Sequence, residues 1–342
     1  MREIIISENE KEQKLLKLLQ KFFKGQKDSF LYKMLRKKNI LLNGKKADGK
    51  ESLHLGDKVQ LYFSEESLEK LSSVKVEENG LWQEQYKKYI VYEDAQLILF
   101  NKPAGLLAEE DAKTRLSVNT LLSSYLLQKG EQNAKTRETF RPGIANRLDR
   151  NTSGLIIFGK TLASLQSLGR LLQSHSLKKK YYALVSGTFD REGLQEAYIR
   201  KDEKRNKVTK ANKETGKYLA SVFSVDRRYR YQGAPFTLLT VDLLTGKTHQ
   251  IRSQLSFLGY PILGDIKYAI PEVNGTKQDI STFPDAEKAY RKLSVKRQLL
   301  HAYSLSFPSL PKEDALYPLS GKTFQIPLAE DFKAVLKQME PL

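Results

Sequence analysis

Residues 141–155 read Arg-Pro-Gly-Ile-Ala-Asn-Arg-Leu-Asp-Arg-Asn-Thr-Ser-Gly-Leu and lead into an apolar, strand-like run, Leu155–Phe158. The Pro, Gly and Asn residues favour a turn before the strand, so we expect Asp149 at the edge of a sheet and not inside a helix. Polar residues on loops held by a buried strand are common in functional sites. The segment therefore predicts a buried strand with a carboxylate presented beside it.

Further strand-like runs occur on both sides of this segment. A helical stretch, Leu162–Leu172, interrupts them, and the runs themselves are Leu97–Phe100, Tyr182–Val185, Ala220–Val225 and Phe236–Leu243. We therefore expect residues 89–330 to form one mixed α+β domain. Two basic, polar stretches, Gln128–Arg137 and Arg200–Lys217, are expected to be loops.

The whole chain is basic, with 58 Lys and Arg against 40 Asp and Glu and a formal charge of +18. Such a charge weakens a fold by self-repulsion and is typical of proteins that bind a polyanion. Residues 11–46 alone hold twelve Lys or Arg and two acids, a net charge of +10. Charge does not distinguish RNA, DNA and anionic lipid, and a basic but unspecialised surface is the alternative.

The pattern of residues 11–63 predicts a small separate module. Apolar spacing favours two amphipathic helices, Glu12–Phe23 and Ser29–Lys37, the second capped by Asp28 or Ser29. A turn at residues 43–44, Asn-Gly, then forms a hairpin. The acidic, polar residues 64–88 are expected to link this module to the larger domain.

Composition excludes several kinds of protein. The chain has no Cys and four His, so disulfides and thiolate metal sites are excluded, and the His spacing fits no metal site. No phosphate-binding glycine-rich loop is present, and we expect no metal, nucleotide or redox cofactor. The first residues lack a signal-peptide pattern, and no run approaches the ~18 apolar residues of a membrane span. We expect a cytoplasmic monomer that contacts no membrane.

Residues 141–155 resemble the signature around the catalytic aspartate of the RluA/RluC/RluD-type pseudouridine synthases. Further segments agree with that family in order and spacing, namely Leu99–Gly105, Lys179–Gly187, Thr245–Arg252 and Gly259–Asp265. Residues 11–63 are similar to the alpha-L RNA-binding module that many members carry. The resemblance implies a mainly antiparallel sheet and a cofactor-free enzyme that isomerises uridine to pseudouridine in structured RNA.

Taken residue by residue, the resemblance implies that Asp149 is the catalytic nucleophile, that Tyr181 contacts the target base and that Arg252 pairs with the aspartate. Breaking N1–C1′ and forming C5–C1′ needs a carboxylate beside the sugar, acting either as a nucleophile or on a sugar proton. A guanidinium within a few Å would keep that carboxylate charged. Strand alternation points Tyr181 toward the cleft and Tyr182 to the other face, and a ring in the cleft can stack on uracil.

A helix predicted at Thr248–Leu258 carries the next site residues. Its spacing places Ile251 on a core face and Arg252 on a neighbouring face toward the cleft. Before it, Lys247 stands where the family usually has arginine, which replaces a planar fork by a point charge for RNA contact. For His249 we favour a structural hydrogen-bonding role over proton transfer.

An enzyme that attacks C1′ inside folded RNA has to move the nucleotide out of its stack, and Arg147 is the family's candidate for filling the gap. Pairing of Arg147 with phosphate alone is the alternative. In the amino-terminal module, basic side chains are expected to grip phosphates without selecting a sequence, namely Lys24, Lys27, Arg36, Lys37, Lys38 and Lys45. We expect large-subunit ribosomal RNA as the substrate. The alternatives are transfer RNA and a non-catalytic RNA-binding assembly factor.

Overall fold

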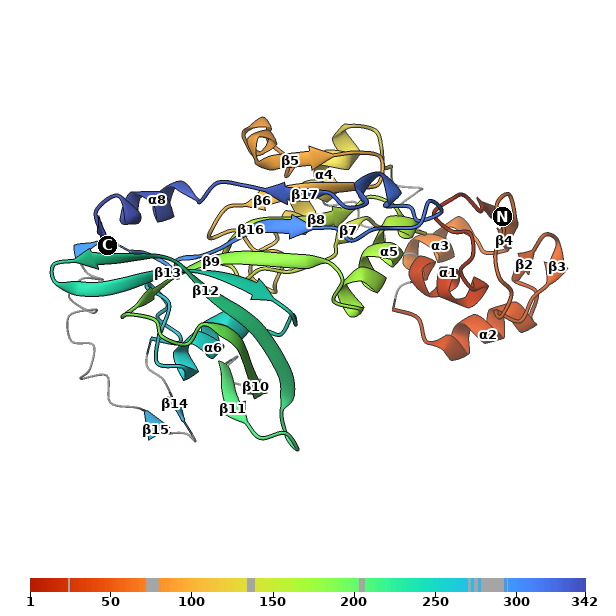
Figure 1. Cartoon of the computed structure of the whole chain (residues 1–342). Coiled ribbons are helices and arrows are strands. Elements are labelled where there is room, and N and C mark those ends of the chain that lie inside the picture. The colour runs from red at the N-terminus through yellow and green to blue at the C-terminus, as the bar shows by residue number, and fades with distance from the viewer. Residues whose placement is uncertain are drawn as a thin grey trace.

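The computed structural model describes residues 1–23, 25–71, 80–133, 139–202, 207–269, 272–273, 276–277, 292–293 and 295–342. A small four-stranded sheet lies at the amino-terminal end of the molecule, and a large twelve-stranded sheet forms the rest (Figure 1). A short hairpin, β14 (Glu272–Val273) and β15 (Thr276–Lys277), forms a separate sheet that contacts β11 (Lys207–Ala211) of the large one. Within the described ranges, no helix is long and apolar enough to cross a membrane.

The small sheet has the strand order β1-β4-β2-β3 and carries two helices. Its elements are β1 (Arg2–Ile5), α1 (Leu15–Phe22), α2 (Asp28–Arg36), β2 (Ile40–Leu42), β3 (Lys45–Lys46) and β4 (Lys58–Leu61). Asn43 and Gly44 both have positive φ, 51° and 72°, as a tight Asn-Gly hairpin turn requires. The predicted helix–helix–hairpin order is present.

Two details of this region differ from the sequence prediction. The N-cap of α2 is Lys27, which makes no side-chain capping bond, and Asp28 instead accepts a hydrogen bond from Gln20 Nε2 at 2.8 Å. Asp28 therefore joins α2 to α1. The core of the small sheet also includes Ile4 and, from α3 (Glu65–Leu71), Leu68, which lie on either side of residues 11–63. The division at residues 11, 63 and 88 stays a prediction.

The large sheet has the order β11-β10-β12-β13-β9-β16-β8-β6-β5. These strands are β5 (Ile90–Glu93), β6 (Leu97–Lys102), β8 (Ser153–Gly159), β9 (Lys178–Ser186), β10 (Gly193–Asp202), β11 (Lys207–Ala211), β12 (Lys217–Tyr231), β13 (Ala234–Leu243) and β16 (Leu300–Ser306). Three short strands pair at its sides, β7 (Gly143–Ile144), β17 (Thr323–Gln325) and β18 (Glu340–Pro341). The pairing of β16 with β8 is parallel and the others are antiparallel, so the predicted mixed, mainly antiparallel sheet is confirmed.

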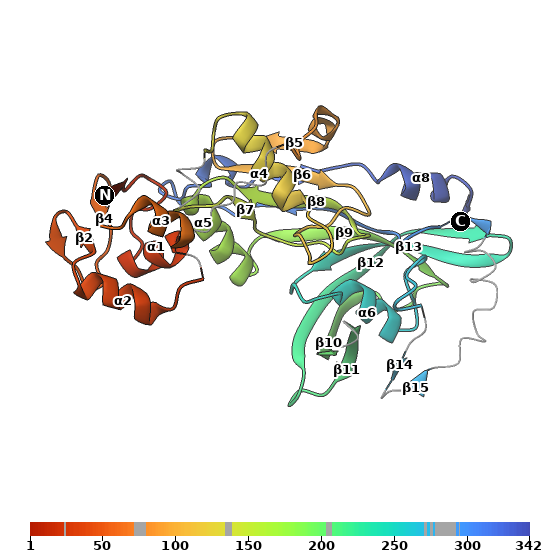
Figure 2. The ribbon, with the colours of Figure 1, turned by 180° about the vertical axis from the view of Figure 1, so that it is seen from behind.

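Helices cover both faces of this sheet, because successive side chains of its strands point to opposite faces and are apolar on both. In β8, Ile156 and Phe158 share a core with α4 (Val118–Gln128) and α6 (Gln250–Phe257), whereas Leu155 and Ile157 pack with α5 (Leu162–Gln173). Figure 2 shows the sheet from behind, with the small module at one end. Short 3-10 turns, η1 (Glu84–Tyr89) and η3 (Tyr317–Leu319), complete the connections.

The stretch Arg200–Lys217 is not the loop that its composition predicts. Residues 200–202, 207–211 and 217 belong to β10, β11 and the start of β12, which pair antiparallel, and residues 203–206 lie outside the described part of the chain. Ile199 and Val208 are buried with Leu219, and the charged residues between them hide this two-residue alternation. Of the other predicted loop, Gln128 ends α4 and residues 134–138 lie outside the described part of the chain.

The chain after residue 330 also belongs to the large domain. In α8 (Glu330–Leu336), Phe332 is fully buried, and Asp331 accepts two hydrogen bonds from Arg297 at 2.6 and 2.8 Å. β18 then pairs with β12. The predicted boundary at residue 330 therefore falls inside a packed segment, because the apolar side of α8 is needed to cover the sheet.

Two glycines let residues 297–302 lie against the segment that holds Asp149 and against the segment that holds Asp265. A Cβ on Gly154, at φ 121°, would lie 2.2 Å from the carbonyl oxygen of Ala302. A Cβ on Gly264, at φ 87°, would lie 1.9 Å from the carbonyl oxygen of Arg297. Only glycine allows a carbonyl oxygen to come so close to its Cα at these two positions.

Candidate active site

One cleft of about 970 Å³ opens where the turn before β8 meets β9 and the start of α6. It is lined by all five residues that the sequence predicts for the large domain, Asp149, Tyr181, Arg252, Arg147 and Lys247. The sheet register explains part of this gathering, because Ala302 of β16 is paired with Gly154 on one side and with Tyr181 on the other.

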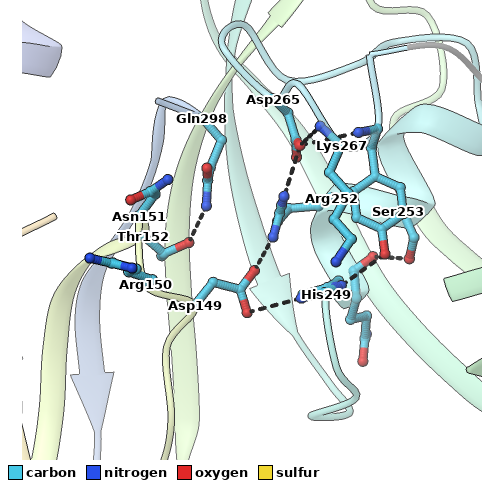
Figure 3. A network of polar contacts seen from close by, with 12 residues as sticks. Asp149, Arg150, Asn151, Thr152, His249, Arg252, Ser253, Asp265, Lys267 and Gln298 are labelled. Carbon is cyan, nitrogen blue, oxygen red and sulfur yellow. Dashed lines mark hydrogen bonds and ion pairs between the residues drawn. The ribbon is translucent and has the colours of Figure 1, made fainter. Parts of the chain in front are cut away.

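The Asp149 carboxylate is one-quarter exposed and has a positively charged partner on one oxygen. Arg252 Nη1 donates a hydrogen bond to Asp149 Oδ2 at 2.6 Å (Figure 3). On the other side, His249 Nε2 lies 3.8 Å from Asp149 Oδ1. Both partners come from the beginning of α6, where the helix dipole also favours a negative charge. Among the described residues, Asp149 Oδ1 therefore has only this longer contact, whereas Oδ2 is hydrogen-bonded.

Arg252 is shared between two carboxylates. Its Nε and Nη2 donate to the two oxygens of Asp265 at 2.6 and 2.8 Å, and Asp265 is nearly fully buried. Asp265 also accepts the backbone N–H groups of Lys267 and Tyr268. Burial acts to lower the pKa of Arg252, but the hydrogen bonds and charges of the two carboxylates outweigh it and raise that pKa. Asp265 thus fixes the orientation of the guanidinium plane so that Nη1 points at Asp149.

Two buried cations hold the turn that carries Asp149. Lys102 Nζ donates to the carbonyl oxygen of Arg150 at 2.8 Å, and Arg297 Nη1 donates to that of Asn151 at 3.2 Å. Burial, together with the charge of Arg297, lowers the pKa of Lys102 to about 7. These contacts follow Asp149 directly in the chain, so they fix the backbone from which its side chain extends.

Tyr181 and Tyr182 lie on opposite faces of β9, as alternation predicts. Tyr181 lines the cleft and is 6% exposed, whereas Tyr182 stacks on Tyr303 with ring centroids 4.0 Å apart. Burial and the charge of Asp149 raise the pKa of Tyr181. Its hydroxyl therefore stays protonated beside the carboxylate.

Arg147 and Lys247 lie on the exposed rim of the cleft. The Arg147 side chain is 67% exposed, and its Nη1 donates to Glu109 Oε2 at 3.0 Å. In the small module, Lys27, Arg36, Lys37, Lys38 and Lys45 are all exposed, and none of them lines the cleft. Lys24 lies outside the described residues. Binding of RNA by these side chains stays a prediction.

Four cleft or support residues were not among the predicted site residues. His249, Lys179 and Lys201 line the cleft, and Asp265 holds Arg252 from behind. Asp265 and Lys179 stand in segments that match the family, so those matches were a usable signal. Lys201 stood in a stretch expected to be a loop, which gave no such signal. Burial lowers the pKa of Lys179, and its ammonium makes no hydrogen bond or ion pair with the described residues.

No metal site is evident in the described ranges, where no three His, Asp or Glu side chains lie close enough to hold an ion. Of the acids that line the cleft, Asp149 is bonded to Arg252 and Glu109 to Arg147. The expectation of a cofactor-free reaction stays a prediction.

Comparisons with known proteins agree with this site. A family model described as RNA pseudouridylate synthase matches residues 96–257. An uncharacterised RNA pseudouridine synthase of Mycoplasma pneumoniae is 34% identical over 316 residues, covering 90% of each chain. The ribosomal large subunit pseudouridine synthase C of Buchnera aphidicola subsp. Baizongia pistaciae is 28% identical over 343 residues, 98% of this chain and 96% of its own. Synthase D of Buchnera aphidicola subsp. Schizaphis graminum is 27% identical over 328 residues, 94% and 93% of the two chains.

A solved structure shares the fold. The structure described as human RNA pseudouridylate synthase domain containing 4 superimposes with a TM-score of 0.55 at 20% identity, over 75% of this chain and 95% of its own. The family model and these relatives identify the chain as an RNA-modifying isomerase. The chain belongs to the RluA/RluC/RluD-type family of RNA pseudouridine synthases.

Proposed function

We propose that this pseudouridine synthase acts on large-subunit ribosomal RNA and that Asp149 is its catalytic nucleophile. The observation that carries the chemical part is the Asp149 carboxylate in the cleft, which has one oxygen hydrogen-bonded to Arg252 and the other held only by the longer contact with His249. The ribosomal target is supported by relatives named large subunit synthases C and D, which are similar to this chain along 98% and 94% of its length. A ribosomal substrate would agree with the predicted cytoplasmic location, and the monomeric state stays a prediction.

In this proposal each cleft residue has one task. Asp149 Oδ1 acts at the sugar, either on C1′ or on a sugar proton, while the N1–C1′ bond breaks. The uracil turns, C5–C1′ forms, C5 loses its proton and N1 gains one, so the reaction is balanced without a redox partner. Tyr181 stacks on the base, which contributes about 1–3 kcal/mol, and its protonated hydroxyl can relay the C5 proton. Arg252 keeps the carboxylate charged when the base displaces water.

RNA contact outside the cleft has two parts in this proposal. Arg147 leaves Glu109 and fills the gap that the flipped nucleotide leaves, because its guanidinium can stack between bases. The exposed lysines and arginines of the small module bind phosphates and add affinity, but phosphate contacts carry no sequence information. Choice of the target uridine therefore depends on the large domain and the shape of the RNA.

The test is a map of pseudouridines in total RNA from cells with the gene, without it, and with only the Asp149→Asn variant. We expect a few uridines of large-subunit ribosomal RNA to lose the modification in the last two. Loss of sites in transfer RNA alone would replace the proposed substrate. Purified Asp149→Asn should bind the target RNA like the wild type and react at least about 10³-fold more slowly. Measurable turnover beyond that trace would contradict the role of Asp149, and an inactive wild type would favour the assembly-factor alternative.

A further inference from the structure

The His249 ring is contacted at both of its nitrogens. Nδ1 lies 2.8 Å from the hydroxyl oxygen of Tyr268, and Nε2 lies 3.8 Å from Asp149 Oδ1. The Tyr268 side chain is almost fully buried, and its hydroxyl accepts the backbone N–H of Val208 at 2.9 Å. Val208 belongs to β11, the edge strand of the large sheet. A continuous chain of contacts therefore runs from β11 to the carboxylate.

The hydrogens in this chain of contacts can be assigned from its geometry. The Tyr268 oxygen accepts from Val208, so the phenol hydrogen is left to donate, and His249 Nδ1 is its neighbouring acceptor among the described residues. If Nδ1 carried a hydrogen instead, the phenol hydrogen would be buried without an acceptor. With Nδ1 accepting, a neutral ring carries its hydrogen on Nε2, which faces Asp149.

The electrostatics agree with a neutral ring. Burial lowers the pKa of His249 to about 4, although Asp149 acts to raise it, and Arg252 and Lys267 lower it further. An unprotonated Nε2 would direct its lone pair at the carboxylate, whereas Nε2–H presents a donor to it. Both ends of the ring therefore favour the same tautomer.

We propose that Tyr268 is a positioning residue that fixes His249 as an Nε2–H donor toward Asp149, and that β11 holds Tyr268 in this role through Val208. The inference rests on the proposed role of Asp149. The carboxylate then lies between two donors, Arg252 on Oδ2 and His249 on Oδ1. The 3.8 Å separation is longer than a hydrogen bond and closes when substrate fills the cleft, as catalytic contacts often do.

The backbone conformation of His249 is of a kind found at functional sites. It is the N-cap of α6 and has left-handed angles, φ 52° and ψ 24°, which are uncommon outside glycine. Such strain persists where surrounding structure holds it and concentrates at functional sites. His249→Gln places its amide nitrogen near the position of Nε2 and so keeps a donor toward Asp149 that does not depend on Tyr268.

The first test is the ring ¹⁵N spectrum of the full-length protein labelled at histidine, which has four histidines to resolve. We expect His249, assigned with His249→Gln, to show a protonated Nε2 and an unprotonated Nδ1, and Tyr268→Phe to populate the other tautomer. Tyr125→Phe is the matched control. It removes a tyrosine hydroxyl that donates to Glu93 Oε2 at 2.8 Å, and neither residue lines the cleft. A hydrogen on Nδ1 in the wild type, or an unchanged spectrum in Tyr268→Phe, would overturn the proposal.

The second test is kinetic and varies the target RNA up to saturation. Tyr268→Phe should lower kcat about 10-fold with KM unchanged, as expected when a hydrogen bond that orients a histidine is lost. In the His249→Gln background the same change should have no further effect, because the donor no longer needs orienting. Wild-type kcat in Tyr268→Phe, or losses that multiply in the double variant, would refute the role of Tyr268. An inactive wild type would contradict the proposed function instead, and the tautomer measurement would still decide this inference.

Discussion

Arg252→Lys separates the charge of Arg252 from its shape. The guanidinium makes three hydrogen bonds of 2.6, 2.6 and 2.8 Å to Asp149 and Asp265 in one plane. A lysine ammonium is a point charge on a flexible stem and cannot bridge both carboxylates in that geometry. We expect it to stay with Asp265, which is the more buried of the two acids.

The magnitude follows from the bonds that are lost. Each hydrogen bond to a charged group contributes about 1.5–3 kcal/mol, so losing two of the three should destabilise the fold by about 3 kcal/mol or more. For a domain of this size that lowers Tm by roughly 6–12 °C. Loss of the Asp149 contact should raise the activation free energy by about 2 kcal/mol, which slows the chemical step about 30-fold.

The assay is single-turnover pseudouridine formation at saturating RNA, below the Tm of the variant, with thermal unfolding measured alongside. Arg170→Lys is the matched control, because Arg170 also pairs with an acid, Asp314, but its side chain is 65% exposed. Because Arg170 is mostly exposed and Asp314 keeps its hydrogen bonds from Ser167 and the backbone of Leu316, this control should keep both the rate and the Tm. An Arg252→Lys enzyme with wild-type rate and stability would refute the proposed role of Arg252 in holding Asp149.

Three further predictions concern RNA binding and cofactors. We expect Lys179, which lines the cleft, to contact one phosphate of the RNA, so Lys179→Met should weaken binding and reduce the slope of log K against log salt by about 0.9. Lys180→Met should change neither, since that ammonium pairs with Asp242 at 3.2 Å; equal effects of the two changes would argue against a phosphate at Lys179. A variant beginning at residue 85 should keep turnover on a short hairpin at high enzyme concentration and show a shallower salt dependence, and a folded but inactive variant at saturation would mean that the small module helps to build the cleft. Chelation of metal ions should leave the rate of pseudouridine formation in pre-folded RNA unchanged. A rate that chelation abolishes and one metal restores would contradict the cofactor-free reaction.

The sequence by itself determined the central strands of the large sheet and five of the residues that line the cleft. Apolar runs and alternation are local signals, so β6, β8, β9 and β13, and the opposite directions of Tyr181 and Tyr182, followed from them. The family match supplied Asp149 and its pairing with Arg252. Where charge masked the alternation, as in β10 and β11, local patterns predicted a loop and were wrong.

Only the tertiary structure decided how the cleft carboxylate is held. Asp265 holds Arg252 from behind, and Val208, which donates to Tyr268, lies 60 residues from it. The position of Asp265 behind Arg252 and the contact from β11 to His249 leave no periodic trace in the chain, because hydrogen bonds between distant segments depend on sheet order and on close approaches such as that at Gly264. Local sequence sets which side chains are available, and the folded sheet sets which atoms of those side chains meet.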